Sequence, residues 1–331
     1  MGRNILAFLS IVLLFTCVPV WARSNGNPDV LPFKIYGTQL IVVQGSIGPL
    51  EKRNLIIDTG AYPTVIDSAI AQKLSLAGHR EELDAIDQTL PALAVTVPSI
   101  EVGPVRAMNV QGLVQDLSEV SRRIGVRIDA LVGLDVLSLS SFVIDYSAKK
   151  ISFGPIDPLP SSVPFVMTKG KLCVDLQAGE NPLRLLVASS AEGIVLLRSH
   201  VPWIPQSDRA RAFASLGGSM VMKEVRLDAL QIGETLLNTN PVYLSTRDTR
   251  IHSFDGFLST ALFQQVAFDF ERKRFGWMMK GERRDRVHLA SKPRDTPPFA
   301  SALVRQLSKG KEGMGIPQAC GTSRDKICSL Q

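Results

Sequence analysis

The chain has 331 residues, 45% of them hydrophobic and 21% charged, with a formal net charge of +6 at pH 7. This length allows one large or two modest domains, and this composition excludes a wholly disordered chain and a polytopic membrane protein. Segment 280–331 carries the excess charge, with 11 Lys or Arg against 5 Asp or Glu, while 23–279 is close to neutral. No nucleic-acid-binding face is therefore expected on the folded part.

The first 22 residues have the pattern of a signal peptide. Arg3 supplies the positive start, Ile5 to Val18 is almost wholly apolar, and Ala22 ends a small-residue cleavage site. The apolar run is short for a membrane span. We expect an exported chain, periplasmic or extracellular, that begins at Arg23 and has no stable membrane span after cleavage. The alternative is an uncleaved N-terminal anchor.

Residues 31–156 and 163–279 both have the pattern of a mostly β structure. Short runs rich in Val, Ile and Leu are separated by Gly and Pro, as expected for strands and turns. Helical patterns are few, and the best cover 66–74 and 133–139. The clearest predicted strands are 40–43, 54–57, 93–97 and 142–144.

An internal repeat indicates two equivalent lobes. Three segments recur in the same order at near-equal spacing. These are 55–61 at 185–191, 99–103 at 229–233, and 129–137 at 255–263. We therefore predict two duplicated, β-barrel-like lobes with few short helices, over 31–156 and 163–279. The proline-rich link 155–160 supports a boundary between them.

The tail and the cysteines point to no metal or cofactor. Segment 280–331 is predicted to be a largely disordered basic tail, with a short helix at 299–307, and it is either solvated or in contact with an anionic surface. After signal cleavage three cysteines remain. Cys173 lies in an apolar run, and pairing of Cys320 with Cys328 stays open. The four histidines are scattered singly, so no metal site is expected.

The sequence Asp58-Thr59-Gly60-Ala61, with Leu-Val-Gly at 131–133, resembles the aspartic peptidases of the pepsin and retropepsin type, particularly bacterial retropepsin-like proteins. The resemblance covers most of 31–279 and implies a bilobal, pepsin-like fold. It also implies that Asp58 is the catalytic acid/base that activates water, that Thr59 braces two facing turns, and that Gly60 and Ala61 shape the turn. In this family two carboxylates share one proton.

The second copy departs from this pattern. Ala188 stands where the second acid is expected, and Ser190 corresponds to Gly60, so this turn is degenerate. Ser189 keeps a hydroxyl where Thr59 has one, so the brace can survive. Glu192 is not expected to reach the position of the missing carboxylate.

Other features of the sequence also bear on the chemistry. Ser259 corresponds to Gly133 of the first copy. The segment between Glu82 and Ala94 contains neither Gly nor Tyr, which argues against a standard closing flap. Ser189 and Ser190 have no neighbouring His in the sequence, which argues against a serine hydrolase.

Three functions remain open. One is a secreted aspartic endopeptidase that hydrolyses polypeptides in a cleft between the lobes and gains its second acid from a homodimer or a partner chain. Another is a non-catalytic pseudoenzyme that binds polypeptide in the same cleft. The last is a two-lobed scaffold whose cleft has no role. The intact turn 58–61 favours the first and Ala188 favours the second, so enzymatic activity stays undecided.

Overall fold

The computed structural model describes residues 30–84, 89–205, 208–215, 218–227, 229–237, 242–246 and 253–281. The chain divides into Met1–Arg286 and Val287–Gln331, and the described residues all belong to the first unit. The predicted signal peptide, the basic tail beyond residue 281 with its helix at 299–307, and Cys320 and Cys328 lie outside the described residues. Those expectations stay predictions.

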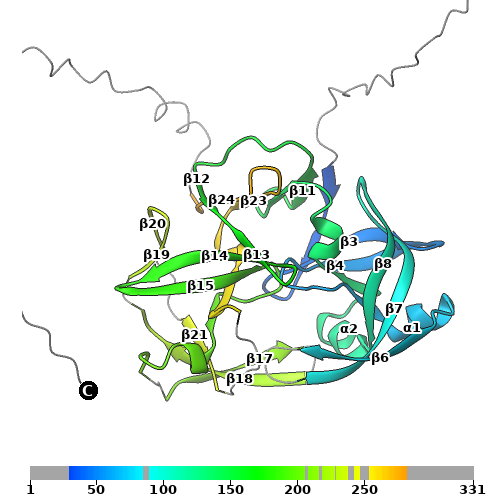
Figure 1. Cartoon of the computed structure of the whole chain (residues 1–331), viewed down its shortest axis with the longest axis horizontal. Coiled ribbons are helices and arrows are strands. Elements are labelled where there is room, and N and C mark those ends of the chain that lie inside the picture. The colour runs from blue at the N-terminus through cyan, green and yellow to red at the C-terminus, as the bar shows by residue number, and fades with distance from the viewer. Residues whose placement is uncertain are drawn as a thin grey trace, which may run out of the picture. The chain divides into compact units, whose positions relative to one another are not determined.

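The structure is mostly β with few helices, as predicted (Figure 1). One sheet of eight strands closes into a ring, because β3 pairs with β7 as well as with β4. Its order is β2 (Lys34–Tyr36), β3 (Leu40–Ile47), β4 (Leu50–Ile57), β9 (Ala130–Val132), β5 (Val65–Asp67), β8 (Val105–Gln115), β7 (Thr89–Val102) and β6 (Gly78–Asp84). All its strands come from the first half of the chain.

A second sheet of ten strands is an open half-barrel built from the second half of the chain. Its order is β17 (Ala210–Ser215), β18 (Gly218–Val225), β21 (Val242–Ser245), β16 (Ile194–Leu196), β22 (Gly256–Ser259), β15 (Asn181–Ala188), β14 (Lys171–Ala178), β19 (Leu230–Ile232) and β20 (Thr235–Leu237), with β13 (Val166–Thr168) on β14.

The third sheet draws three strands from each half. Its order is β1 (Val30–Pro32), β11 (Lys150–Phe153), β10 (Phe142–Asp145), β23 (Gln265–Asp269), β24 (Arg274–Met278) and β12 (Ser161–Pro164). The halves meet where β10 pairs antiparallel with β23, with Phe142 opposite Phe268. The proline-rich link 155–160 connects β11 to β12.

The two halves repeat one pairing pattern. In the first, β4 runs parallel to β9 while β5 passes antiparallel to β9 and parallel to β8. In the second, β15 runs parallel to β22 while β16 passes antiparallel to β22 and parallel to β21. β4 therefore ends just before Asp58, and β15 ends at Ala188, in equivalent places. This is the arrangement that brings the two turns together.

The predicted helices exist but are shorter than expected. Residues 66–74 were expected to be helical, but Val65–Asp67 pairs as β5 and the helix α1 covers only Ser68–Lys73. The side chain of Asp67 accepts a hydrogen bond from the amide of Ala69 and so fixes the start of α1. The helix expected at 133–139 is α3, Leu134–Leu137.

One helix was not predicted. This is α2, Ser118–Ile124, which has no buried residues and ends at Gly125 with a φ of 73°. An exposed helix lacks the apolar stripe by which a helix is identified in a sequence. The remaining helical elements are the 3-10 turns η1 (Arg198–His200) and η2 (Thr260–Leu262). None of the helices in the described ranges has the length and apolarity needed to cross a membrane.

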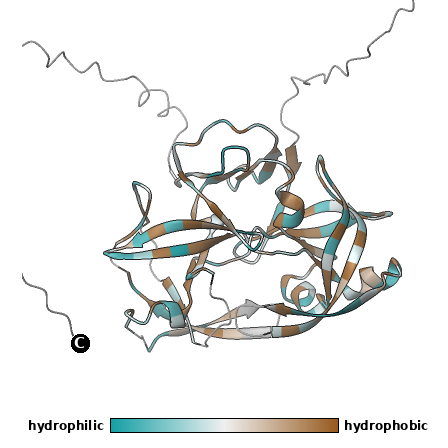
Figure 2. Ribbon diagram, in the orientation of Figure 1, coloured by the Kyte–Doolittle hydropathy of each residue, from teal (hydrophilic) through white to brown (hydrophobic). Residues whose placement is uncertain are grey.

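The core joins the halves. One cluster of buried apolar side chains contains residues from all three sheets, and apolar residues recur along their strands (Figure 2). At the seam, the rings of Phe142 and Phe268 stack with centroids 4.7 Å apart. Phe268 also meets Phe275 edge-on, and Phe275 stacks on Trp277. Such aromatic pairs add stability beyond the area that they bury.

The segment between Glu82 and Ala94 forms a hairpin without Gly or Tyr. β6 and β7 pair antiparallel as far as Asp84 opposite Thr89, and residues 85–88 lie outside the described ranges. The second half has a corresponding hairpin, β17–β18. β6 and β7 therefore form a hairpin that is paired over seven residue pairs, and the expectation against a standard closing flap stays a prediction.

Candidate functional site

The turn that holds Asp58 is set by its own backbone and by β9. The amide of Asp58 donates to the carbonyl of Val132, and the amide of Ala61 donates to the carbonyl of Asp58 at 3.1 Å. A Cβ on Gly60 would lie 2.9 Å from the Cβ of Ala188. Glycine is therefore required at position 60, because the facing turn leaves no room for a side chain.

Asp58 is buried, with 8% of its surface exposed, and it accepts two hydrogen bonds at one oxygen. Its Oδ1 receives the amide of Gly60 at 2.9 Å and the hydroxyl of Ser190 at 2.7 Å. Burial raises the pKa of Asp58, while these two hydrogen bonds and the charge of Lys171 oppose the rise. The sequence identified Ser190 as the counterpart of Gly60 in the degenerate turn, but it did not predict this hydrogen bond to Asp58.

Ala188 ends β15 and presents only a methyl group to Gly60. No proton can be shared with Asp58 from this position. Glu192 does not substitute, because its carboxylate pairs with Arg211 at 2.9 Å. The two turns are therefore in contact, but one carries a carboxyl group and the other does not.

The hydroxyl brace expected from Thr59 and Ser189 is present and complete. The Oγ1 of Thr59 donates to the carbonyl of Val187 and accepts from the amide of Ser189. The Oγ of Ser189 donates to the carbonyl of Ile57 and accepts from the amide of Thr59. All four distances lie between 2.7 and 3.0 Å, and both side chains are fully buried. Serine thus serves in place of threonine.

A second layer of contacts supports the Asp58 turn from β9. Asp135 accepts hydrogen bonds from the amide and the hydroxyl of Thr64, and that hydroxyl oxygen accepts from the amide of Gly133. A Cβ on Gly133 would lie 2.5 Å from the carbonyl oxygen of Ala61. Burial raises the pKa of Asp135. Because Asp135 is engaged with Thr64, we assign it to holding the turn.

The corresponding position in the second half, Ser259, lies in β22. Its hydroxyl accepts from the amide of Ala261, and its amide donates to the carbonyl of Gly193. Ser259 therefore has local partners of its own beside the Ala188 turn.

Lys171 and Gln39 lie at the edge of the site. Neither belongs to a sequence motif from which this position could have been predicted. Lys171 begins β14, and its charge acts on Asp58. The side-chain amide of Gln39 donates to the carbonyl of Ser190 at 3.1 Å. Each lies well before the turn of its own half in the chain, so only the hairpins β2–β3 and β13–β14 bring them near.

The burial of Asp58 predicts a pH-dependent stability. A carboxyl group whose pKa is raised on folding stabilises the fold below its unfolded pKa of about 3.9, and this stabilisation is lost as the pH rises through the folded pKa. Asp58→Asn should therefore increase the free energy of unfolding at pH 7, where the buried carboxylate is a cost, with no gain at low pH. Urea unfolding across this pH range measures it.

The matched control for this prediction is Asp116→Asn. Asp116 is exposed, and its hydrogen bond to the amide of Ser118 lowers its pKa, so this variant should lose stability at neutral pH. A loss of stability at pH 7 in Asp58→Asn would mean that Ser190, Gly60 and Lys171 hold the ionised form of Asp58 favourably.

Comparison with known proteins gives one family. The profile described as aspartyl protease matches residues 43–136, which contain the Asp58 turn, β9 and most of α3. No curated protein matches the chain. In the described ranges, no three His, Cys, Asp or Glu side chains gather as a metal site requires.

Proposed function

Because residues 43–136 form an aspartyl protease domain, we propose that the chain binds an extended polypeptide across the turns at Asp58 and Ala188 without hydrolysing it. One observation carries this proposal. Ala188 meets Gly60 with a methyl group, while the hydroxyl of Ser190 occupies Oδ1 of Asp58. The Asp58 turn is intact, and the residue that faces it from the second half carries no acid.

The proposal includes a bilobal, pepsin-like architecture made of two duplicated lobes, 31–156 and 163–279. The repeated strand pairing on either side of the β10–β23 seam supports it, as does the reciprocal brace of Thr59 and Ser189. Export by the predicted signal peptide would deliver this two-lobed protein to the periplasm or the extracellular space.

The lack of hydrolysis follows from proton sharing. In a pair of carboxylates, one activates water while the other protonates the substrate, and neither can do both at once. Asp58 faces a methyl group and a serine hydroxyl, and an ordinary serine hydroxyl does not supply a proton as a carboxylic acid does. Removing one member of a catalytic unit costs several orders of magnitude in rate.

A homodimer that pairs two Asp58 turns is less compatible with this fold. The Thr59 hydroxyl and amide are already bonded to Val187 and Ser189 of the same chain. A second copy would have to displace this brace and separate β10 from β23. Such a dimer would expose the stacked rings of Phe142 and Phe268. The brace therefore favours a monomeric site.

The second candidate function is an exported aspartic endopeptidase that works with one acid or with a carboxylate from a partner chain. The observation that favours it is the complete Asp58 turn, in which Gly60, Ala61, Val132 and the brace are all in place. A retained turn is what a working carboxylate requires.

Hydrolysis assays separate the two candidates. The full-length protein and its Asp58→Asn variant are incubated with denatured casein between about pH 3 and 7, and peptide release is measured by mass spectrometry. We expect the wild-type protein to release no more peptide than the Asp58→Asn variant. Release by the wild type that disappears in the variant would support the endopeptidase, and a steep rise with protein concentration would support the homodimer.

Binding is measured separately, by hydrogen exchange in the presence of a randomised decapeptide pool. We expect slower exchange in residues 58–62 and 188–192, and unchanged exchange in β19–β20, which lie elsewhere in the half-barrel. Protection confined to other segments would contradict a binding role for the two turns.

A further inference from the structure

A tight hairpin presents Lys171 to the Asp58 turn. β13 and β14 pair with Thr168 opposite Lys171, and the two residues between them, Lys169 and Gly170, both have positive φ, at 48° and 78°. Two consecutive residues of this kind form a turn that matches the twist of the paired strands. The backbone of Lys171 is therefore held in a defined position.

Tyr62 holds this hairpin against the other half of the chain. Tyr62 directly follows the Asp58 turn, and its ring lies so close to Gly170 that a Cβ there would be 2.4 Å from the ring carbons. Tyr62 nevertheless keeps 45% of its surface exposed. The Asp58 turn and the β13–β14 hairpin therefore touch, although they lie far apart in the sequence.

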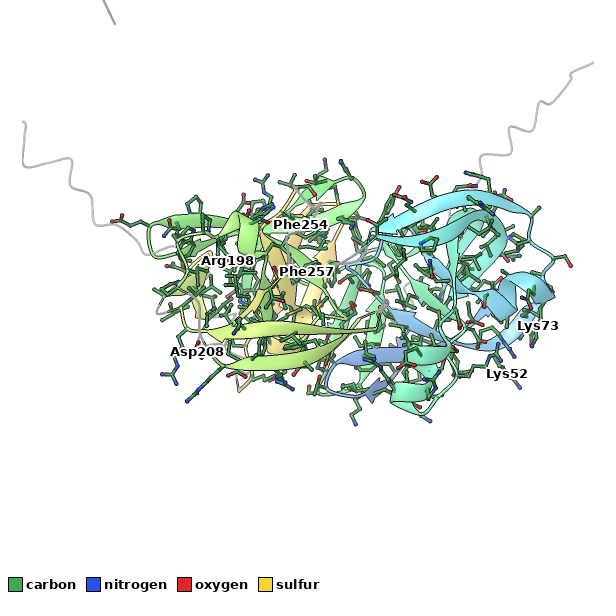
Figure 3. All side chains as sticks on the ribbon, turned by 90° about the horizontal axis from the view of Figure 1, so that it is seen from below. Lys52, Lys73, Arg198, Asp208, Phe254 and Phe257 are labelled. Carbon is green, nitrogen blue, oxygen red and sulfur yellow. The ribbon has the colours of Figure 1, made fainter. Side chains whose placement is uncertain are left out.

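The ammonium group of Lys171 contacts an aromatic ring, and its charge acts on Asp58. Its Nζ lies 5.8 Å from the centroid of Phe254, within the range of a cation–π contact. The ring of Phe254 meets that of Phe257 edge-on, with centroids 5.3 Å apart, and Figure 3 labels both inside the second half. Both rings belong to the buried cluster that includes Ala188. The cation thus borders the face that lacks an acid.

Lys171 adds a positive charge beside Asp58, where an aspartic peptidase would hold a second carboxylate. Two carboxylates that share one proton carry one negative charge. Asp58 and Lys171 together carry no net charge when Asp58 is ionised and one positive charge when it is protonated. A ligand with a negative group is therefore favoured here, where a site with two carboxylates would disfavour it.

We propose that Lys171 selects the ligand, and that its ammonium group binds a carboxylate of the polypeptide held at the Asp58 turn. This inference rests on the proposed binding function. The carboxylate comes either from an acidic side chain or from the C-terminus of the peptide, since both offer the same acceptor oxygens.

Three pools of randomised, fluorescein-labelled decapeptides test the inference by fluorescence anisotropy. The first has a central Glu and an amidated C-terminus, the second a central Gln and a free C-terminus, and the third a central Gln and an amidated C-terminus. We expect the wild type to prefer the first or the second pool to the third, which identifies the source of the carboxylate. Lys171→Met should weaken the preferred pool about tenfold and the third by less than about twofold.

The control variants are Lys171→Arg, which should keep the preference, and Lys169→Met, which removes an exposed charge from the same turn and should change nothing. Equal weakening of all pools by Lys171→Met, or equal binding of all pools by the wild type, would overturn the inference but leave the binding function in place. If no pool bound to the wild type, the proposed function would fail and the inference with it.

Discussion

The double substitution Ala188→Asp, Ser190→Gly is expected to give the protein peptidase activity, raising kcat/KM on denatured casein by about 10³-fold over the wild type. The backbone around position 188 is already in place, because β15 ends there and the brace fixes the following residue. The introduced carboxyl group would face Asp58 across Gly60, and the introduced glycine would remove the hydroxyl that now occupies Oδ1 of Asp58. Activity is measured as peptide release near pH 4 to 5, roughly where a carboxylate pair holds one proton.

Three controls locate the effect. Ser190→Gly alone should stay inactive. Ala188→Asp alone should gain less activity than the double variant, because the Ser190 hydroxyl still donates a hydrogen bond to Asp58. Adding Asp58→Asn to the double variant should abolish its activity. A folded double variant without activity would show that the missing acid is not the only defect, and Ser259 would be the next position to change to glycine.

Thr59→Val should lower the free energy of unfolding by about 3 kcal/mol. Valine matches the shape of threonine but leaves the amide of Ser189 and the carbonyl of Val187 buried without partners. Each such group costs about 1 to 3 kcal/mol. Because these bonds join the two halves of the chain, the loss should appear in the main unfolding transition when the protein is titrated with urea.

The brace offers a matched set of variants. Thr59→Ser keeps the hydroxyl and should lose only the packing of one methyl group, or about 1 kcal/mol. Thr96→Val removes an exposed hydroxyl that interacts with Gln111, and it should change stability by less than about 0.5 kcal/mol. An equally small effect of Thr59→Val would mean that water replaces the lost bonds and that the other contacts between the halves, among them the seam at β10–β23, suffice to join them.

Much of this fold could be predicted because its signals are local or repeated. The apolar runs before Asp58 and around Leu131 predict strands, and a repeat with equal spacing predicts equivalent turns. The reciprocal brace followed from keeping a hydroxyl at Ser189. The first helix was predicted to begin at residue 66 and begins two residues later, at Ser68. A short apolar run before a helix does not show whether it belongs to the helix or to a preceding strand, here β5.

The rest depends on contacts between distant segments. Ser190 was identified as a departure from glycine, but its bond to Asp58 requires the two turns to meet. Lys171 belongs to no motif and reaches the site only because the β13–β14 hairpin folds against Tyr62. The pairing of β10 with β23 was also not predicted, because the sequence of a strand does not determine by itself which other strand it pairs with.

The sheet shared by the two halves determines what a protease could do to this protein. A nick in the link 155–160 would cut the chain, yet the fragments would stay associated through β10–β23 and the buried phenylalanines. A gene fragment encoding 31–156 alone would instead present β10 as a bare edge with apolar rings on its surface, which is a template for aggregation. Proteolytic trimming at the link is thus compatible with an intact protein, whereas separate synthesis of the first half is not.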